Sequence, residues 1–440
     1  MAIFSRRSLQ RLINENSEFL LPSQARKHVQ ALNRMNKELT LGVEWEVVLL
    51  NALSKCGKVI HERDFGGTNY ADVYWESRAN PAFNFVAEIT TVSDKGLDQL
   101  NPVEALSAEL NKIVASRGLN PGRFWFRVGV HNEPRYKGGP KVKLKLTGRA
   151  RFAETIFDAN FHNFLEHISR NLQSPNQYLR QTDQTDVEIR YNPDQQFGGG
   201  TYLNYTAVYS LADNLLYNSL SEKASQLNGT NFHGPIGIIL CDGDCEFLSQ
   251  PPIGNLSYTL DEVIRHFLIE NSPIHFILTC VVKDCGDRMS THLGPFQLTL
   301  HLYKGLRFEE IPFDLWQIVQ NLVFPMPKRN AVNARNVLKG PKPHEGSKHG
   351  GEITVKEHEA TVKVSTRTLM EFLAGRISQE EFFQRCCGSF AKETFEQALR
   401  ACKLIVSVER SLEEDDDWLI FQMSGPDPAI SQFSFPRKNR

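Results

Sequence analysis

Residues 83–92 read FNFVAEITTV, an almost unbroken apolar run that contains a single acid, Glu88. A run of this kind is typical of a central strand that is buried on both faces of a sheet. A second strand-like run, YADVYWE at 70–76, precedes it, and the turn-prone segment SRANP joins the two. A buried charge without a partner costs several kcal/mol. Glu88 therefore needs a cationic partner or a metal ion.

Helices and strands alternate around this hairpin. LGVEWEVVLLNALSKC at 41–56 has helical spacing, and Gly57 after it is a natural C-cap. Downstream, PIGIILC at 235–241 is another buried-strand pattern, and DEVIRHFLIEN followed by IHFILTCVV is a further helix and strand. Such alternation over the first 320 residues predicts a mixed α/β domain. We also expect strands at 124–131, 184–191 and 202–209, and helices at 102–117, 153–172 and 211–227.

The composition changes at both ends of this region. Residues 1–40 predict an N-terminal extension of two short amphipathic helices. Residues 326–351 are rich in Pro, Gly, Lys and His and predict a flexible linker. Residues 352–440 predict a small α+β domain with strands at VKVS, LIVSVER and WLIFQM and helices at 367–374 and 378–402. The domain in between is expected to span 41–325.

Composition and charge exclude several classes of protein. Apolar residues make up 41% and charged residues 23%, so neither wholesale disorder nor a fibrous repeat is expected. The net charge of −1 excludes a globally basic nucleic-acid binder but leaves room for a local basic groove. No stretch approaches the roughly 18 apolar residues of a membrane span, and the first residues lack the apolar core of a secretory signal. We therefore expect a soluble, cytoplasmic protein that does not bind membranes.

Three acids are candidates for one site. Glu46 lies on the 41–56 helix, Asp72 on the first strand of the hairpin and Glu88 on the second. Carboxylates on adjacent strands, together with a carbonyl, form the hard oxygen site that Mg²⁺ prefers. An ion bound there activates water and stabilises the charge that develops on a phosphodiester. We expect Asp72 and Glu88 to hold Mg²⁺ or Mn²⁺, with Glu46 beside them.

The order of these motifs resembles the PD-(D/E)xK restriction-endonuclease-like superfamily. The resemblance is carried by GVEWE at 42–46, GGTNYAD at 66–72 and FNFVAEIT at 83–90. In that superfamily a helix Glu, a strand Asp and an E-x-K strand assemble a metal-dependent nuclease site. The resemblance implies a restriction-endonuclease-like mixed sheet flanked by helices, here with a large insertion and the small C-terminal domain.

The sequence departs from that pattern at Thr90, where the family has lysine. A missing lysine leaves a charge at the scissile phosphate to be neutralised by another group. The family tolerates migration of this lysine to the following core helix, where the chain has Lys223 and Gln226, three residues apart on one helix face. This interpretation makes residues 95–205 an insertion within the core. If the insertion is not there, Lys95 and Lys112 are the alternative donors.

A basic, glycine-rich stretch lies within the expected insertion. It has no acid between Arg135 and Arg151 and is expected to include a VKLKL strand. A charge run is usually a solvated face, but its place in the insertion favours contact with a phosphate backbone. The candidate nucleic-acid ligands are Arg135, Lys137, Lys141, Lys143, Lys145 and Arg149.

Four cysteines follow predicted strands in pairs. Three residues separate Cys241 from Cys245, and four residues separate Cys280 from Cys285. Four thiolates could hold a structural Zn²⁺, but the spacing is not the usual C-x2-C. Free cysteines are therefore the favoured interpretation, with structural zinc as the alternative.

The leading functional hypothesis is a metal-dependent nuclease that hydrolyses phosphodiester bonds, with DNA as the expected substrate. The resemblance also implies a part in a restriction or antiphage defence system. The alternative is a catalytically inactive, nuclease-derived subunit that binds nucleic acid or acts as a scaffold, because no lysine follows Glu88 at Thr90. Residues 352–440 are a candidate surface for a protein partner, and homo-oligomerisation is left open.

Overall fold

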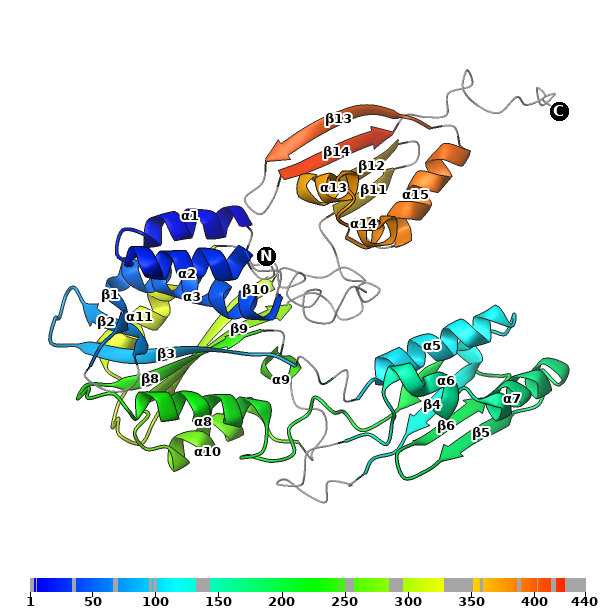
Figure 1. The fold of residues 1–440 in the computed structure, drawn as a ribbon, viewed down its shortest axis with the longest axis horizontal. Coiled ribbons are helices and arrows are strands. Elements are labelled where there is room, and N and C mark those ends of the chain that lie inside the picture. The colour runs from blue at the N-terminus through cyan, green and yellow to red at the C-terminus, as the bar shows by residue number, and fades with distance from the viewer. Residues whose placement is uncertain are drawn as a thin grey trace.

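The chain folds into three α+β units, each built on its own sheet (Figure 1). The computed structural model describes residues 4, 6–33, 37–65, 70–94, 97, 101–131, 143–243, 245–249, 257–284, 296–327, 351–356, 359–385, 389–401, 403–412 and 417–423. Most of the linker expected at 326–351 lies outside these residues.

The first unit is a mixed six-stranded sheet flanked by helices, with the strand order β1-β2-β3-β8-β9-β10. The central strands β3, β8 and β9 are parallel, and all other neighbours are antiparallel. The strands are β1 (Gly57–Arg63), β2 (Ala71–Ser77), β3 (Asn84–Val92), β8 (Ile236–Asp242), β9 (Phe276–Asp284) and β10 (Phe296–Lys304).

Helices cover both faces of this sheet. One face packs against α1 (Arg6–Asn16), α2 (Pro22–Asn33), α3 (Lys37–Cys56) and α11 (Phe313–Leu322). The other face packs against α8 (Leu215–Leu227) and α10 (Leu260–Glu270), drawn in green below the sheet in Figure 1. Side chains alternate along β3, so that Phe85 and Ala87 join the first core and Val86 joins the second. By the same alternation Glu88 is directed toward α8.

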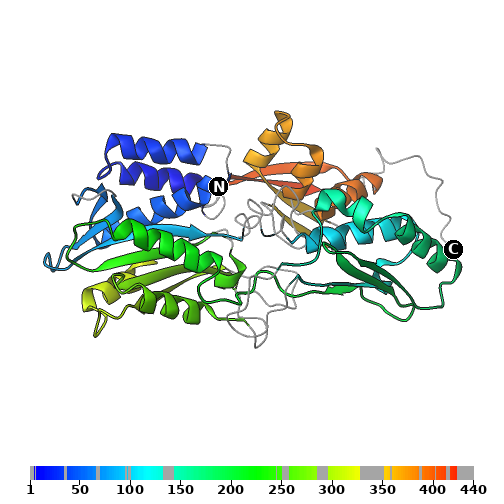
Figure 2. The ribbon, with the colours of Figure 1, turned by 60° about the horizontal axis from the view of Figure 1, so that its bottom comes forward.

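The second unit is inserted between β3 and α8. Its sheet has the order β5-β6-β4-β7 and lies apart from the six-stranded sheet (Figure 2). Its apolar core is separate from the two cores above. The expected boundaries of 95–205 enclose all four strands. The elements are α5 (Val103–Ser116), η1 (Pro121–Arg123), β4 (Phe124–Val128), η2 (Arg149–Arg151), α6 (Phe152–Thr155), α7 (Ala159–Arg170), β5 (Asn176–Gln181), β6 (Asp186–Tyr191) and β7 (Gly199–Thr201).

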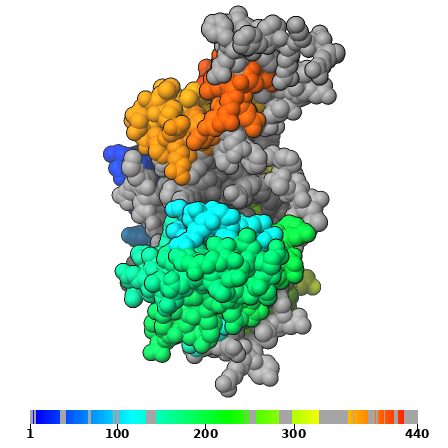
Figure 3. Space-filling model, turned by 90° about the vertical axis from the view of Figure 1, so that its right-hand side faces the viewer, coloured from blue at the N-terminus to red at the C-terminus, as the bar shows by residue number. Residues whose placement is uncertain are grey.

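The third unit, at the C-terminus, has the sheet order β11-β12-β14-β13 with helices packed on it. In the space-filling view of Figure 3 it is orange, and the inserted unit is cyan and green. Its elements are β11 (Gly351–Lys356), β12 (Glu359–Ser365), α13 (Thr366–Leu373), α14 (Gln379–Arg385), α15 (Ser389–Arg400), β13 (Ile405–Leu412) and β14 (Asp417–Met423).

Several sequence-based expectations about the elements are wrong. α3 ends at Cys56, as the C-cap position of Gly57 predicts, but Gly57 is already the first residue of β1. Residues 202–209 form no strand, and the single helix expected at 378–402 is divided into α14 and α15. The expected VKLKL strand is reduced, within the described residues, to an isolated bridge between Val130 and Leu144.

The short helix α9 (Glu246–Ser249) follows β8. No helix among the described residues has the length and apolar character needed to cross a membrane.

Candidate active site

Asp72 and Glu88 lie at the point where the pairing of β2 with β3 ends. The two strands are antiparallel, as expected, and the last paired residues there are Val73 and Ala87. Beyond them the Asp72 N–H donates to Glu88 Oε1 at 3.2 Å, and the Ile89 N–H donates to Asp72 Oδ2 at 2.9 Å. Each carboxylate therefore satisfies a backbone donor of the neighbouring strand, which fixes the two acids relative to each other.

Lys223 reaches this pair of acids from α8. Its Nζ lies 2.7 Å from Glu88 Oε2 and 3.8 Å from Asp72 Oδ2. Gln226, one turn further along the helix, accepts a hydrogen bond from the same Nζ at 3.0 Å. The Glu88 side chain is 3% exposed and that of Lys223 is 21% exposed, so the acid is buried and the amine reaches toward solvent.

Thr90 does not take part in this contact. Its Oγ1 forms a hydrogen bond of 2.9 Å with the Ser219 hydroxyl, which joins β3 to α8 two residues beyond Glu88. The hydroxyl therefore helps to hold the helix that carries Lys223. A cation is supplied to the acids from α8 and not from position 90.

Burial and mutual repulsion dominate the electrostatics of the site. Burial raises the pKa of Asp72 well above its usual value, the carboxylate of Glu88 raises it further, and Lys223 only partly opposes this. Burial alone would lower the pKa of Lys223, but the carboxylates of Asp72 and Glu88 outweigh burial, and the pKa of Lys223 is raised. The site thus has two crowded acids and one firmly charged amine.

Glu46 lies near Asp72 and Lys223, but its carboxylate contacts two histidines. Its Oε1 is 3.3 Å from His28 Nε2 on α2 and 3.3 Å from His61 Nε2 on β1. Burial acts to raise the pKa of Glu46, but the hydrogen bond and charge of His28, followed by His61 and Lys223, leave this pKa lowered. Glu46 also acts on Asp72, since its charge contributes to the raised pKa of that acid.

Sequence reasoning missed the two histidines. His61 lies in GKVIHER, a run of mixed polarity that did not suggest a strand, and His28 lies 33 positions earlier on a separate helix. No short spacing connects them. The only available signal was that each falls on an element next to the helix of Glu46.

The carboxylates fit a hard divalent cation. Asp72 and Glu88 offer oxygen donors of the kind that Mg²⁺ prefers, and a cation there would oppose the burial and the charge of Glu88 that raise the pKa of Asp72. Asp72 and Glu88 would hold such an ion.

Of the two alternative lysines, Lys112 does not reach the acids. Lys112 lies on the exposed side of α5, in the inserted unit. Lys95 lies outside the described residues.

The basic stretch is only partly described. Lys143 and Arg149 are exposed on the inserted unit and Lys145 is half-buried. The Lys145 N–H donates to the Gly129 carbonyl at 2.8 Å, which attaches this segment to the end of β4. Arg135, Lys137 and Lys141 fall outside the described residues.

The cysteines proposed as the alternative zinc ligands are partly described. Cys241 and Cys280 are register partners on β8 and β9, and burial raises the pKa of Cys241 well above its usual value. The Cys245 thiol instead donates to Asp94 Oδ1 at 3.3 Å. Cys285 lies outside the described residues.

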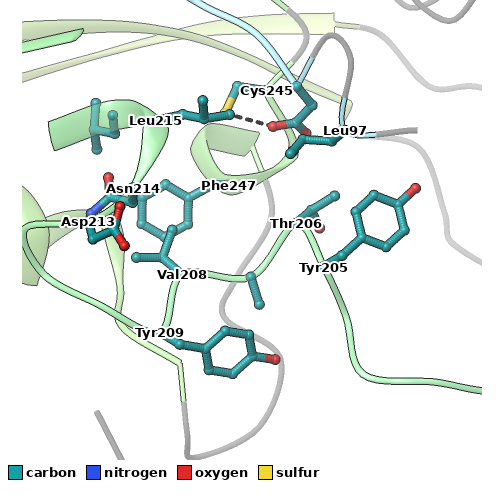
Figure 4. Close-up of a pocket in the computed structure, with 13 residues that line it drawn as sticks. Leu97, Tyr205, Thr206, Val208, Tyr209, Asp213, Asn214, Leu215, Cys245 and Phe247 are labelled. Carbon is teal, nitrogen blue, oxygen red and sulfur yellow. Dashed lines mark hydrogen bonds between the residues drawn. The ribbon is translucent and has the colours of Figure 1, made fainter. Parts of the chain in front are cut away.

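A small pocket lies where the chain enters and leaves the inserted unit (Figure 4). Its wall includes Leu97, Tyr205, Tyr209 and Phe247, and its volume is about 50 Å³. One water molecule needs about 10–15 Å³ of cavity volume measured in this way, so the pocket has room for a few water molecules and not for a nucleotide.

No protein-family model, curated protein or solved structure matches this chain.

Proposed function

We propose that the chain is a Mg²⁺-dependent nuclease of the PD-(D/E)xK type that hydrolyses phosphodiester bonds in DNA. The observation that carries the proposal is the position of Lys223, whose Nζ lies 2.7 Å from Glu88 and 3.8 Å from Asp72. Thr90 occupies the position at which the superfamily has lysine. A helix lysine beside the two acids supplies the charge that would otherwise be missing.

The architecture supports the same proposal. An antiparallel hairpin, β2–β3, carries the acids, and β3 then pairs in parallel with β8 after the helix α8. The inserted unit lengthens the connection between β3 and α8 without disturbing the central sheet. This arrangement agrees with a restriction-endonuclease-like core that holds a migrated lysine.

Each residue has a defined part in the proposed reaction. A bound Mg²⁺ or Mn²⁺ ion supplies an activated water and neutralises charge on the scissile phosphate. Asp72 and Glu88 would hold the cation, and the hydrogen bonds that their carboxylates accept from the Ile89 and Asp72 N–H groups fix the two side chains relative to each other. Lys223 stabilises the negative charge that develops on the phosphate oxygens. Gln226 holds the amine through its 3.0 Å hydrogen bond and so orients it.

DNA is proposed as the substrate because of the basic stretch between Arg135 and Arg151 in the inserted unit. Lys143 and Arg149 are exposed there and can contact phosphates. The net charge of the whole chain is −1, so the contact would be local. A place in a restriction or antiphage system, in the cytoplasm, would follow from the same resemblance.

One observation favours the second candidate, an inactive nucleic-acid-binding or scaffold subunit. The ammonium of Lys223 already pairs with Glu88 at 2.7 Å, and such a pair satisfies the buried acid without a metal ion. Binding of Mg²⁺ distinguishes the two, because a nuclease requires the acids to accept the ion and a scaffold does not.

The test is incubation of the purified chain with plasmid, linear duplex, single-stranded DNA and RNA, in Mg²⁺, Mn²⁺ or EDTA. We expect cleavage of DNA with either ion and none in EDTA. Asp72→Ala and Glu88→Ala should abolish cleavage and leave the fold intact, as judged by thermal melting in EDTA. Lys112→Ala is the matched control, because the Lys112 side chain is exposed and lies on α5, in a different unit from the acids. Full cleavage by Glu88→Ala would refute the proposed role.

A further inference from the structure

His28, Glu46 and His61 converge from three elements on one point. His28 is on α2, Glu46 on α3 and His61 on β1. Among the described residues, this is the one group of three His, Cys, Asp or Glu side chains whose ligand atoms all lie within 4.8 Å of one another. Both imidazole Nε2 atoms are 3.3 Å from the same oxygen, Glu46 Oε1.

The tautomer of His61 is fixed by a backbone contact. Its Nδ1 lies 2.6 Å from the carbonyl oxygen of Asp72. A carbonyl can only accept, so Nδ1 carries the proton and donates it. In a neutral ring, Nε2 then presents its lone pair to Glu46 Oε1, which is also an acceptor. The two lone pairs can face each other only if a proton or a metal ion lies between them.

A metal-binding histidine usually donates a hydrogen bond from its other ring nitrogen to a carbonyl or carboxylate oxygen. Such an outer hydrogen bond fixes the tautomer, orients the ring and increases the basicity of the ligating nitrogen. The His61 side chain is 3% exposed and that of His28 is 6% exposed, so both rings are held by packing. Gln24 reinforces this by donating to the His61 carbonyl at 2.9 Å, which ties α2 to β1.

We propose that His28, Glu46 and His61 bind a divalent transition-metal ion, such as Zn²⁺ or Co²⁺. Two imidazole nitrogens and one carboxylate oxygen suit ions of this class, whereas Mg²⁺ and Ca²⁺ prefer oxygen ligands alone. Three protein ligands leave coordination positions open, as at catalytic metal sites. Glu46 is the most exposed of the three, at 22%, and gives the ion access to solvent.

This site differs from the one formed by Asp72 and Glu88. The His61 ring nevertheless bonds to the backbone of Asp72, so the two sites are adjacent. The inference goes beyond the proposed nuclease, because metal binding by these three residues can be measured without any cleavage. A chain that binds the ion and never cuts DNA would leave this proposal intact and end the other.

The experiment measures metal binding by the full chain after treatment with EDTA and dialysis. The probes are Co²⁺, followed by its visible absorption, and Zn²⁺, followed by elemental analysis after dialysis. We expect one tightly bound ion per chain and a Co²⁺ spectrum of nitrogen and oxygen ligands. Intense thiolate-to-metal absorption would instead assign the ion to cysteine and overturn the proposal.

The metal affinities of variants at the three ligands show where the ion is bound. Loss of an outer-sphere partner costs about 10–100-fold in metal affinity, so loss of a ligand in His28→Asn, His61→Asn or Glu46→Gln should exceed about 100-fold. Glu88→Gln, at the neighbouring site, should keep the tight ion. His167→Asn, an exposed histidine on α7, is the matched control.

Two results contradict the proposal. One is a wild-type chain that retains no transition-metal ion, because the cluster is then an imidazolium–carboxylate group. The other is unchanged affinity in folded His28→Asn and His61→Asn chains. If a variant does not fold, the stoichiometry and the spectrum of the wild-type chain still decide.

Discussion

Lys223→Met should destabilise the first unit, because it removes the cation that pairs with the buried Glu88 and the partly buried Asp72. The amine lies 2.7 Å from Glu88, whose side chain is 3% exposed, and Met keeps most of the volume of the aliphatic stem. Breaking a buried pair by removing one partner costs about 3–5 kcal/mol. Lys223 is 21% exposed and Asp72 is 26% exposed, so water reaches part of the site and the lower end, about 3 kcal/mol, is expected.

The effect on melting follows from the size of the unit. For a domain of about 150–250 residues, each kcal/mol lowers the Tm by roughly 2–4 °C, so a decrease of about 6–12 °C is expected. The chain has several units and need not melt in one step. The transition of the first unit is followed by tryptophan fluorescence, because Trp45 and Trp75 are buried in its core. Melting is measured in EDTA, so that no ion replaces the lost charge.

The dependence on pH tests the cause. The pKa of Lys223 is raised by its neighbours, so its stabilising contribution is fully present below the pKa of an unfolded lysine and is complete at pH 7.5. As the pH falls, Asp72 is the first of the two acids expected to take up a proton, because burial and Glu88 raise its pKa. The loss caused by Lys223→Met should therefore be smaller at pH 5 than at pH 7.5.

Lys112→Met is the control for this experiment. Lys112 is exposed on α5, and its replacement should change stability by no more than about 0.5 kcal/mol. Equal melting of Lys223→Met and the wild type at pH 7.5 would refute the reasoning that Lys223 neutralises the buried acids.

Two further predictions concern stability. Asp72→Asn should stabilise the chain in EDTA at pH 8 and have less effect at pH 5. Burial and the charge of Glu88 raise the pKa of Asp72 in the folded chain. The wild type therefore loses stability as the pH rises through that pKa, and the uncharged Asn does not. Melting curves at the two pH values measure this, and a variant less stable than the wild type at pH 8 would contradict it. Gly237→Ala should cost about 1–3 kcal/mol, because the added methyl group meets the buried ring of Phe276 in the central sheet. Urea unfolding measures this cost, with Gly148→Ala as the control, since nothing lies within 4 Å of its added methyl; equal losses in both variants would exclude the packing argument.

The sequence identified the central hairpin and its acids because their pattern is local. The almost unbroken apolar run FNFVAEITTV predicts a buried strand, and Glu88 is conspicuous in it because it is the single acid. Antiparallel pairing of the two strands is confirmed by the structure. The choice of Lys223 depended on chain order alone, since a lysine on an amphipathic helix has no local signal of burial.

The strands that the sequence did not predict are rich in polar residues or lie at the edge of a sheet. β5 reads NQYLRQ and β1 reads GKVIHER, and neither shows the apolar run or clean alternation that predicts a strand. β10, at the edge of the first sheet, was not anticipated either. These strands are stabilised by pairing with a neighbour, which a local pattern does not reveal.

The histidine–glutamate group could not be predicted for a similar reason. His28 and His61 meet only because α2 packs beside β1, and Gln24 connects the two elements. Such a group is a product of tertiary packing, and its ligands have no fixed spacing in sequence.

The most direct test of the proposed nuclease is the rate of DNA cleavage under single-turnover conditions by the wild type, Lys223→Ala and Lys223→Met in Mg²⁺, with DNA binding measured in parallel. The account predicts that both variants bind DNA as the wild type does and cleave it slower by orders of magnitude, the pattern for an interaction made mainly in the transition state. Wild-type cleavage rates in both folded variants, or a wild-type chain that cuts no DNA with either Mg²⁺ or Mn²⁺, would contradict it.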